Sequence, residues 1–294
     1  MALQSPELEV AGITAVSGNV PVEKAALNAL RVVELFDRRD VWVAEGLANP
    51  LIRDPIRAYE FHGTDGLGDS NLPLPNMSVK SKSGLDLIPE IVSSAKKREI
   101  TIIATGPLTN IAALLTKDPD LASQIGELVI MGGAFGLTDH GYGNETPAAE
   151  FNIYSDPEAA KIVFESELSI KAVGLDVTML PEAHLTPNDY ARIKAGKTRP
   201  ARFASMILSR IMKRSRRFAL HDPMAVAAKV RPSLFRFKTH RILVETRGVH
   251  TTGMTVVDRR DWLPENKRIG HNMMVCTRAS SQDFKSLFLK RILR

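Results

Sequence analysis

The order of apolar and polar residues follows two periodicities along the chain, one typical of strands and one of amphipathic helices. Runs rich in β-branched and aliphatic residues predict strands at residues 8–16, 41–44, 100–105, 128–131 and 170–175. Apolar residues at helical spacing predict helices at residues 22–36, 85–97, 186–195 and 202–216, and one that starts at residue 108. Strands that alternate with helices form a largely parallel sheet with helices on both faces.

The last third of the chain is expected to complete the same domain. Its pattern predicts a helix at residues 224–229, strands at 241–246 and 254–257, an apolar stretch at 273–276 and a closing helix near 282–293. The chain has no internal repeat, low-complexity tract or clear linker. We therefore predict one α/β domain over residues 1–294, with an open, mostly parallel (mixed) sheet of Rossmann-like architecture.

One segment departs from this regularity, from residue 46 to about residue 83. A loop-rich segment of this length inside a compact domain is usually functional. It contains His62 before Gly63, in a run of glycines that can approach a ligand closely. His62 is therefore either a ligand-contacting residue or a structural histidine.

A second polar segment lies at residues 143–152, where Asn144, Glu150 and Asn152 bring two carboxamides and a carboxylate together. These groups could bind the hydroxyl groups of a ligand. They could equally satisfy the backbone of a turn, as Asn and Asp side chains often do. The segment runs into a helix start, where Asp156 is a plausible N-cap and Pro157 the first helical residue.

Polar residues also follow the predicted strands at their carboxyl ends, where open α/β sheets bind ligands. Asn19 follows the strand at residues 8–16, and Thr105 and Met131 end the strands at 100–105 and 128–131. Met131 could instead be a core residue and Thr105 an ordinary strand-end residue. The topology nevertheless predicts that all three lie near the loop at residues 143–152.

The sequence His221-Asp222-Pro223 places an ionisable pair at the start of a predicted helix. Such a pair could combine a carboxylate ligand with a proton donor. Asp222 could alternatively be only an N-cap before Pro223. His221 on its own could be a structural histidine.

Composition excludes several classes of protein. Hydrophobic residues make up 44% of the chain, which is enough to fill a sizeable core. The net charge of +6 includes the basic run Lys213, Arg214, Arg216 and Arg217, which we interpret as a solvated face rather than a nucleic-acid site. The single cysteine, Cys276, excludes a disulfide framework and is expected to be buried. No apolar run reaches the roughly 18 residues of a membrane span, and no signal peptide is recognisable, so a cytoplasmic protein is expected.

Taken together and in order, these motifs resemble the nucleoside hydrolases, often called inosine-uridine preferring. The resembling stretches span most of the chain: Gly12-Ile13-Thr14 with Ser17-Gly18-Asn19, residues 62–68, residues 104–110, residues 129–133, Asn144, residues 149–152, residues 156–160, and His221-Asp222-Pro223.

The resemblance implies hydrolysis of the N-glycosidic bond of a ribonucleoside to base and ribose, through an oxocarbenium-like transition state. It also implies a bound Ca²⁺, with Thr105 offering its backbone carbonyl and Asp222 its carboxylate. In the same way Asn19, Asn144, Glu150 and Asn152 would hold the ribose, and Met131 would pack near the sugar. His221, with an ordinary pKa near 6.5, would protonate or hydrogen-bond the leaving base, and His62 would lie on the base side.

Several further expectations come from the resemblance. The partners are a small nucleoside and other copies of the chain, in a homodimer or homotetramer, with no nucleic acid and no membrane. The two histidines are more similar to the inosine-uridine and pyrimidine groups of the family than to its purine-specific enzymes. The loop before His221 lacks the tyrosine usual in the family, so base preference stays open between purine and pyrimidine.

The chain also departs from the family at its first residues. The family begins with a strand that ends in an Asp-x-Asp-x-x-x-Asp-Asp motif, which supplies the catalytic base and further Ca²⁺ ligands. This sequence contains no such motif, so we expect one strand and most of one helix to be absent relative to the family. Glu7 and Glu9 lie at the wrong end of a strand to replace the aspartates. The alternative to a hydrolase is therefore an impaired homologue that binds nucleoside or ribose without turnover.

Overall fold

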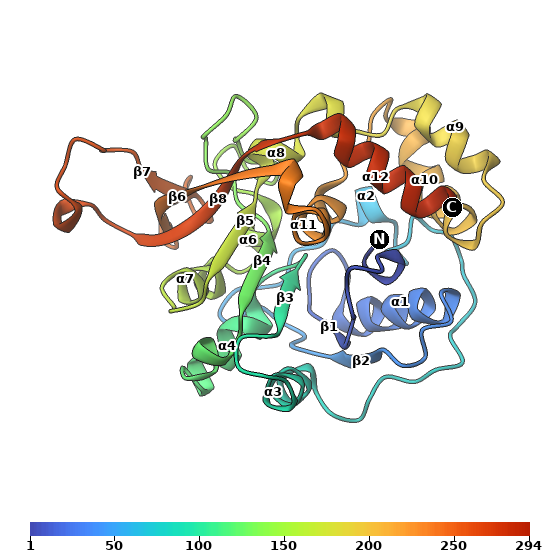
Figure 1. Ribbon diagram of the computed structural model, residues 1–294, viewed down its shortest axis with the longest axis horizontal. Coiled ribbons are helices and arrows are strands. Elements are labelled where there is room, and N and C mark those ends of the chain that lie inside the picture. Colours follow the sequence, from blue (N-terminus) through green and yellow to red (C-terminus); the bar gives the residue numbers. More distant parts are fainter.

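The computed structural model describes residues 1–294 as an α/β fold with two sheets (Figure 1). A two-stranded parallel sheet contains β1 (Gly12–Ala15) and β2 (Trp42–Glu45). A six-stranded sheet has the order β3-β4-β5-β8-β6-β7. Its strands are β3 (Thr101–Ala104), β4 (Glu127–Met131), β5 (Ile170–Val173), β6 (Phe235–Val244), β7 (Thr255–Asp258) and β8 (His271–Ala279). The pairs from β3 to β8 are parallel, whereas β6 is antiparallel to both of its neighbours.

The helices connect these strands and cover both faces of the larger sheet. They are α1 (Val22–Leu35), α2 (Tyr59–His62), α3 (Gly84–Ser94), α4 (Thr109–Lys117), α5 (Leu121–Gln124), α6 (Phe151–Ser155), α7 (Pro157–Phe164), α8 (Leu175–Thr178), α9 (Pro187–Ala195), α10 (Arg199–Arg214), α11 (His221–Val230) and α12 (Ser281–Leu293). Four short 3-10 helices lie at Ala2–Gln4, Pro181–Ala183, Pro232–Leu234 and Glu265–Lys267.

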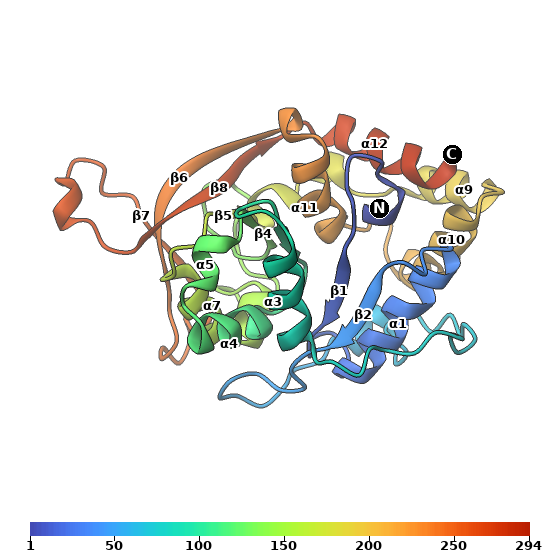
Figure 2. The same cartoon turned by 60° about the horizontal axis from the view of Figure 1, so that its bottom comes forward.

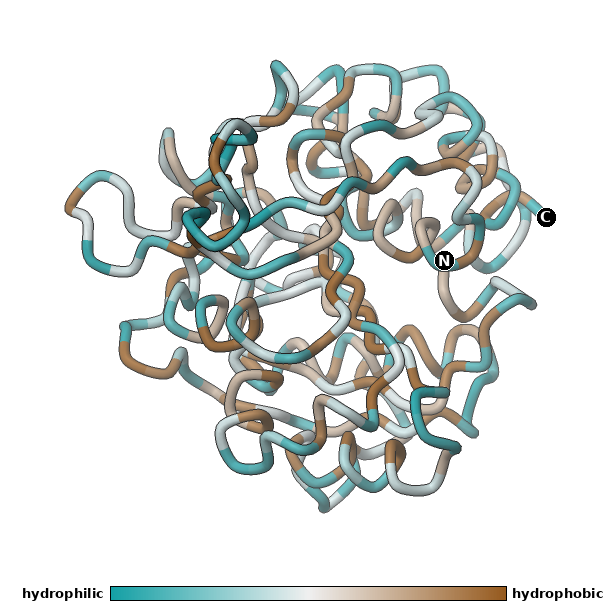
Figure 3. Tube along the Cα trace, turned by 60° about the vertical axis from the view of Figure 1, so that its left-hand side comes forward, coloured by the Kyte–Doolittle hydropathy of each residue, from teal (hydrophilic) through white to brown (hydrophobic).

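Strand β4 shows how the sequence builds two core layers. Successive side chains of a strand point to opposite faces. Leu128 and Ile130 therefore pack with residues of α3, α4 and α7, while Val129 and Met131 pack with residues of α11 and α12. In Figure 3 many of the strongly hydrophobic segments run through the middle of the trace, and most outer turns are hydrophilic. The prediction of helices on both faces of a mostly parallel sheet is confirmed.

The two sheets are not hydrogen-bonded to each other, because β1 pairs only with β2 and β3 pairs only with β4. The loops that follow these strands nevertheless touch. A Cβ atom added to Gly18 would lie 3.1 Å from Cδ of Pro107, and the Asn110 side chain donates a hydrogen bond of 2.9 Å to the carbonyl of Ala15. The carboxyl ends of β1 and β3 thus lie side by side.

Several element boundaries differ from those predicted. The strand expected at residues 8–16 is reduced to β1 because its partner β2 is only four residues long. The strand expected at 241–246 is the end of a longer strand, β6, whose first half pairs along β8 although its polar residues obscured the pattern. The irregular segment at 46–83 contains the short helix α2.

The region from β6 to β8 projects from the body of the molecule (Figure 2). Beyond β7 a loop at residues 259–270 leads back into β8 and carries Trp262, whose side chain is largely exposed. The chain termini lie close together on the opposite side of the molecule (Figure 1). None of the helices combines the length and the apolar character that crossing a membrane would require.

Candidate active site

The predicted polar residues gather where strands end and helices begin. Asn19 follows β1, Thr105 follows β3 and Met131 ends β4. The remaining residues belong to the loop before α6, to α6 itself, to the end of α2 and to the first turn of α11: Asn144, Glu150, Asn152, His62, His221 and Asp222. Parallel strands direct their carboxyl ends to one edge, so the topology brings these elements together.

Glu150 fixes the start of α6 and the turn after β4. Its Oε1 atom accepts a hydrogen bond of 2.9 Å from the amide of Asn152, and its Oε2 atom accepts bonds of 3.1 Å from the amides of Ile153 and Gly133. The residue is 2% exposed, and burial raises its pKa although the backbone amides oppose that shift. Glu150 is therefore an N-cap whose carboxylate is aimed by three fixed donors.

The two asparagines divide their amide groups between the backbone and the space in front of α6. Asn144 accepts a hydrogen bond of 2.9 Å from the amide of Phe151, so its oxygen faces inward and its NH₂ group stays free. Asn152 donates a bond of 3.0 Å to the carbonyl of Met131, so its nitrogen faces inward and its oxygen stays free. The interpretation that these side chains satisfy local backbone is therefore confirmed, and each of them also leaves one polar group without a partner in the protein.

Asn19 is held in place by the segment that follows β2. The amide of Ala58 donates a hydrogen bond of 3.1 Å to the Asn19 carbonyl. The guanidinium of Arg57 donates to the Ser17 hydroxyl at 3.0 Å and to the Gly18 carbonyl at 3.2 Å. The Asn19 side chain makes no hydrogen bond within the protein, so its carboxamide is free for a ligand.

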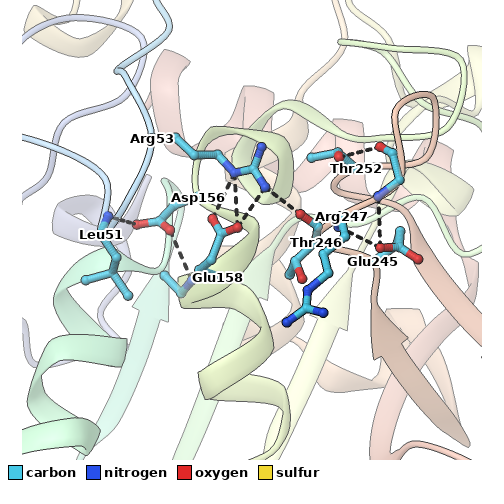
Figure 4. A network of polar contacts seen from close by, with 10 residues as sticks. Leu51, Arg53, Asp156, Glu158, Glu245, Thr246, Arg247 and Thr252 are labelled. Carbon is cyan, nitrogen blue, oxygen red and sulfur yellow. Dashed lines mark hydrogen bonds and ion pairs between the residues drawn. The ribbon is translucent and has the colours of Figure 1, made fainter.

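The same segment, residues 47–58, is also attached to the helix that follows the polar loop (Figure 4). Asp156 accepts hydrogen bonds from the amide of Leu51 at 2.9 Å, from the hydroxyl of Thr109 at 2.8 Å and from the amide of Ala159 at 3.0 Å. Its side chain is 0% exposed. The predicted N-cap is confirmed, and the same carboxylate also joins α7 to α4 and to the strap, as we call residues 47–58.

Arg53 adds a second attachment of the strap. Its guanidinium binds the Glu158 carboxylate with two nitrogens, the shortest contact being 2.7 Å, and donates a bond of 2.6 Å to the Thr246 carbonyl (Figure 4). The strap therefore connects the loop that carries Asn19 with the start of α7 and with the loop after β6.

Asp222 does not cap a helix. Helix α11 begins at His221, Asp222 lies in its first turn, and no side chain caps it, so the N-cap alternative is wrong. The Asp222 carboxylate is open to water and makes no hydrogen bond or ion pair. Surrounding protein atoms and the charge of Glu150 nevertheless raise its pKa to about 7. The Asp222 carboxyl group is therefore accessible to water, although the surrounding protein atoms disfavour its charged form.

His221 lies beside Asp222, with its Nδ1 atom 2.8 Å from the hydroxyl of Thr178. Burial, with smaller contributions from the nearby His184 and His62, lowers the pKa of His221 to about 4. Burial also lowers the pKa of His62. The expected ordinary pKa near 6.5 is therefore wrong for His221, because the ring is largely removed from water.

The side chains of this chain do not form a complete divalent cation site. No group of three or more His, Cys, Asp and Glu residues comes together. Ca²⁺ takes about six to eight oxygen ligands, most of them carboxylate or carbonyl oxygens. Thr105 and Asp222, the two ligands implied by the resemblance, are both exposed and would supply two. The residues present therefore do not fit a complete Ca²⁺ shell.

Other residues have the structural roles that the sequence favoured. Cys276 is 0% exposed, and burial raises its pKa to about 12. Glu7 forms an ion pair with Arg291 of α12 and so lies away from the polar loops, as expected. The basic residues at the end of α10 are exposed.

Three residues that contact the predicted site residues or their loops had little local signal in the sequence. Thr178 ends α8 in an apolar stretch, and nothing local indicates its contact with His221. Arg53 and Arg57 lie in the irregular segment, and their side-chain partners Glu158 and Ser17 are more than 35 positions away in the sequence. Only the length of that segment indicated that it had a role.

Comparison with known proteins gives a consistent family. The family model described as inosine-uridine preferring nucleoside hydrolase matches residues 1–286. A pyrimidine-specific ribonucleoside hydrolase, RihA of Escherichia coli O7:K1, is 39% identical over 299 aligned positions, which cover 99% of this chain and 92% of that protein. A RihA of Salmonella agona is also 39% identical over the same shares.

Solved structures agree with the sequence relatives. A plant nucleoside hydrolase, the PpNRh1 enzyme, matches with a TM-score of 0.89 and 32% identity over 99% of this chain and 93% of that chain. A purine-preferring ribonucleoside hydrolase from Gardnerella vaginalis matches with a TM-score of 0.86 and 31% identity over 99% and 92%. From its fold, its polar cleft residues and these relatives, the chain belongs to the inosine-uridine preferring nucleoside hydrolase family.

Proposed function

We propose that this chain hydrolyses the N-glycosidic bond of ribonucleosides in the cleft between the loop before α6 and the first turn of α11. The observation that carries the proposal is the pair of free amide groups on Asn144, in the loop before α6, and on Asn152, in the first turn of α6. The Asn144 NH₂ group is a donor and the Asn152 oxygen is an acceptor, and both are held by backbone hydrogen bonds. A ribose presents hydroxyl groups that donate and accept, so this pair suits it.

Ribose binding would use four side chains and one apolar contact. Asn19, Asn144 and Asn152 would hydrogen-bond the sugar hydroxyls, Glu150 would accept from another, and Met131 would pack against the ring. Because these donors and acceptors are fixed before substrate arrives, little free energy is lost in ordering them. Hydrogen bonds from these side chains to the ribose would raise kcat to the extent that they are stronger in the transition state than in the bound substrate.

The electrostatics of the cleft suit a cationic sugar. Glu150 and Asp222 lie close enough for the charge of Glu150 to raise the pKa of Asp222. Departure of the base leaves positive charge on the ribose, as in glycoside hydrolysis. Carboxylates fixed near that charge would lower the energy of the transition state.

On the base side, His221 would interact with the departing base and His62 would contribute from α2. With its lowered pKa, His221 is neutral near pH 7. It would therefore act chiefly by donating a hydrogen bond that strengthens as negative charge grows on the leaving base.

For metal, Thr105 and Asp222 are the oxygen ligands that this chain would offer to Ca²⁺, and they are too few to complete its shell. We therefore expect weak Ca²⁺ binding by these residues alone.

We also propose, from the resemblance to the family, that the protein is cytoplasmic and forms a homodimer or homotetramer. Light scattering of the purified chain tests the oligomeric state, and a monomer at all concentrations would contradict it.

The activity is tested by ribose release from uridine, cytidine and inosine, measured with and without added Ca²⁺. The wild-type chain should release ribose, and Asn152→Ala should lower kcat/KM about tenfold to hundredfold, since it removes a hydrogen bond to a charged transition state. Asn266→Ala, at an exposed position in the projecting loop, is the matched control and should not change kcat/KM. Equal kcat/KM for wild type and Asn152→Ala would refute the ribose assignment.

A second candidate function is nucleoside or ribose binding without turnover. It is favoured by one observation, the missing cluster of carboxylates around Asp222. Calorimetry that detects ribose or uridine binding, weakened in Asn152→Ala, with no ribose release under any Ca²⁺ concentration, would support this candidate over the first.

A further inference from the structure

The hydroxyl of Thr178 meets the ring of the proposed leaving-group histidine. Thr178 is the last residue of α8, which follows the carboxyl end of β5, and its side chain is 0% exposed. Its Oγ1 atom lies 2.8 Å from Nδ1 of His221, at a separation of 43 positions in the sequence. This is the one hydrogen bond that either side chain makes within the protein. The contact is therefore specific and removed from competing water.

The backbone on both sides of this contact is also fixed. Leu185 and Phe218 form an isolated antiparallel bridge, in which the Leu185 amide donates to the Phe218 carbonyl at 2.9 Å and the Phe218 amide donates back at 3.1 Å. Leu185 lies seven residues after Thr178, and Phe218 three residues before His221. The two segments are thus held in register at a second point, so the side chains cannot drift apart independently.

The chemistry of imidazole gives this contact a directional consequence. The two ring nitrogens are distinct, and the hydrogen bond made by one of them sets how the other is presented. A flip of the His221 ring would replace Nδ1 with a carbon atom and leave the buried Thr178 hydroxyl without a partner. An unpaired buried polar group costs about 1–3 kcal/mol. The bond therefore favours one ring orientation and leaves Nε2 as the free nitrogen.

We propose that Thr178 is a positioning residue for hydrolysis, which holds the His221 ring so that Nε2 is presented to the departing base. The proposal rests on the proposed function of His221. Thr178 itself touches neither sugar nor base in this role. Its contribution is made through His221, so it should matter only when the leaving group needs help from a hydrogen-bond donor.

A purely structural role predicts something different. If Thr178 only fills the core, replacing it should destabilise the chain and lower turnover of every substrate alike. If it positions His221, the loss should depend on the leaving group. Uridine releases a basic pyrimidine anion, whereas 4-nitrophenyl β-D-ribofuranoside releases a weakly basic phenolate that departs without a donor.

The test compares Thr178→Val, which nearly keeps the shape and removes the hydroxyl, with Thr178→Ser, which keeps the hydroxyl. For Thr178→Val we expect kcat for uridine to fall about tenfold to hundredfold, with KM nearly unchanged, because the variant loses part of the roughly hundredfold to ten-thousandfold that a positioned donor contributes. Turnover of the nitrophenyl riboside should stay within about threefold of wild type, because its phenolate departs without a hydrogen-bond donor. Thr178→Ser should restore most of the uridine turnover.

Thr198→Val is the matched control. It also removes a hydroxyl hydrogen bond, which Thr198 donates to the Ile292 carbonyl at 2.6 Å. Thr198 is the N-cap of α10 and is distant in sequence from the residues of the proposed site. It should lower stability without changing the ratio of the two substrates. Equal losses for both substrates in Thr178→Val, or no loss for uridine, would overturn the proposal.

A readout without turnover separates this proposal from the proposed function. In ¹⁵N spectra of histidine-labelled protein, with His221 assigned by His221→Gln, wild type and Thr178→Ser should give one set of ring signals for His221. Thr178→Val should give shifted or exchange-broadened signals. If uridine is not hydrolysed but the spectra change in this way, the proposed function fails and the positioning contact stands. Identical spectra for wild type and Thr178→Val would overturn the contact itself.

Discussion

At the scale of single residues, two short side chains of the proposed site each bind the backbone and leave a polar group free. Asn144 and Asn152 each use one polar atom of the carboxamide in a hydrogen bond to a backbone group. Because the backbone partner is a donor in one case and an acceptor in the other, the free halves have opposite character. The same hydrogen bonds that shape the loop therefore decide which polar atoms a ligand meets.

Cys276, which has no role in the proposed site, shows how burial suppresses the reactivity of a side chain. Burial raises its pKa to about 12, so the thiolate is scarce at pH 8, whereas an exposed thiol ionises near pH 8.5. We expect alkylation of the native chain by iodoacetamide at pH 8 to be at least about a hundredfold slower than alkylation of the chain unfolded in guanidinium. Raising the pH from 7 to 9 should accelerate the native reaction by about a hundredfold, because the thiolate fraction of a thiol whose pKa lies far above the working pH rises about tenfold per pH unit.

Mass spectrometry of the alkylated chain measures both rates. Cys276 is the single cysteine, so the modified fraction reports on this site alone. A native rate that equals the unfolded rate would mean that the thiol is accessible, against its 0% exposure.

At the scale of elements, the strap at residues 47–58 links parts of the site that are distant in sequence. Asp156 and Glu158 hold it at the start of α7, and Arg57 holds it at the loop of Asn19. A ligand that touches both Asn19 and the loop before α6 would therefore meet two surfaces of fixed separation. The irregular segment thus has a structural role, because its hydrogen bonds and ion pair fix the loop of Asn19 relative to the start of α7.

Asp156→Asn tests the strap. The carboxylate accepts three hydrogen bonds, and an amide in its place must turn an NH₂ group toward at least one donor. We expect the free energy of unfolding in urea to fall by about 1–3 kcal/mol, the cost of an unsatisfied buried group. Amide exchange in residues 47–58 should also become faster.

The matched control is Asp54→Asn, because Asp54 is exposed, lies in the strap itself and makes no side-chain hydrogen bond. It should change the free energy of unfolding by less than about 0.5 kcal/mol. If Asp156→Asn were as stable as Asp54→Asn, the buried carboxylate would not hold the strap.

At the scale of the whole molecule, the two sheets differ in how firmly they are built. The pair β1 and β2 packs on a small apolar cluster with α1, whereas β4 and β5 are central strands with apolar layers on both faces. Two-stranded sheets are marginal by themselves. Stability should therefore be uneven across the fold.

Hydrogen exchange measures this difference. We expect the amides of β4 and β5 to exchange most slowly, close to the limit set by global unfolding, and those of β1 and β2 to exchange faster by about tenfold or more. Helix α12, which belongs to neither sheet, serves as the internal reference. Equal protection of β1 and β4 would show that the two sheets unfold as one unit.

Much of this architecture was readable from the sequence. The change from helical to strand periodicity fixed most element types, because a residue pattern of period two or 3.6 fits only one kind of buried surface. The positions of Asn19, Thr105, Met131 and His221 at element ends followed from the same pattern. Boundaries were less certain: the polar first half of β6 paired with β8 only because a partner strand was available.

The sequence by itself thus determined the fold class, the succession of elements and which polar residues reach the same edge of the sheet, since these depend on local pattern and connectivity. Tertiary structure alone decided the protonation of His221 and Asp222, because burial and neighbouring charges set their pKa. It also decided which half of each asparagine stays free and that Thr178 meets His221. Those properties belong to atoms that become neighbours only when distant segments pack together.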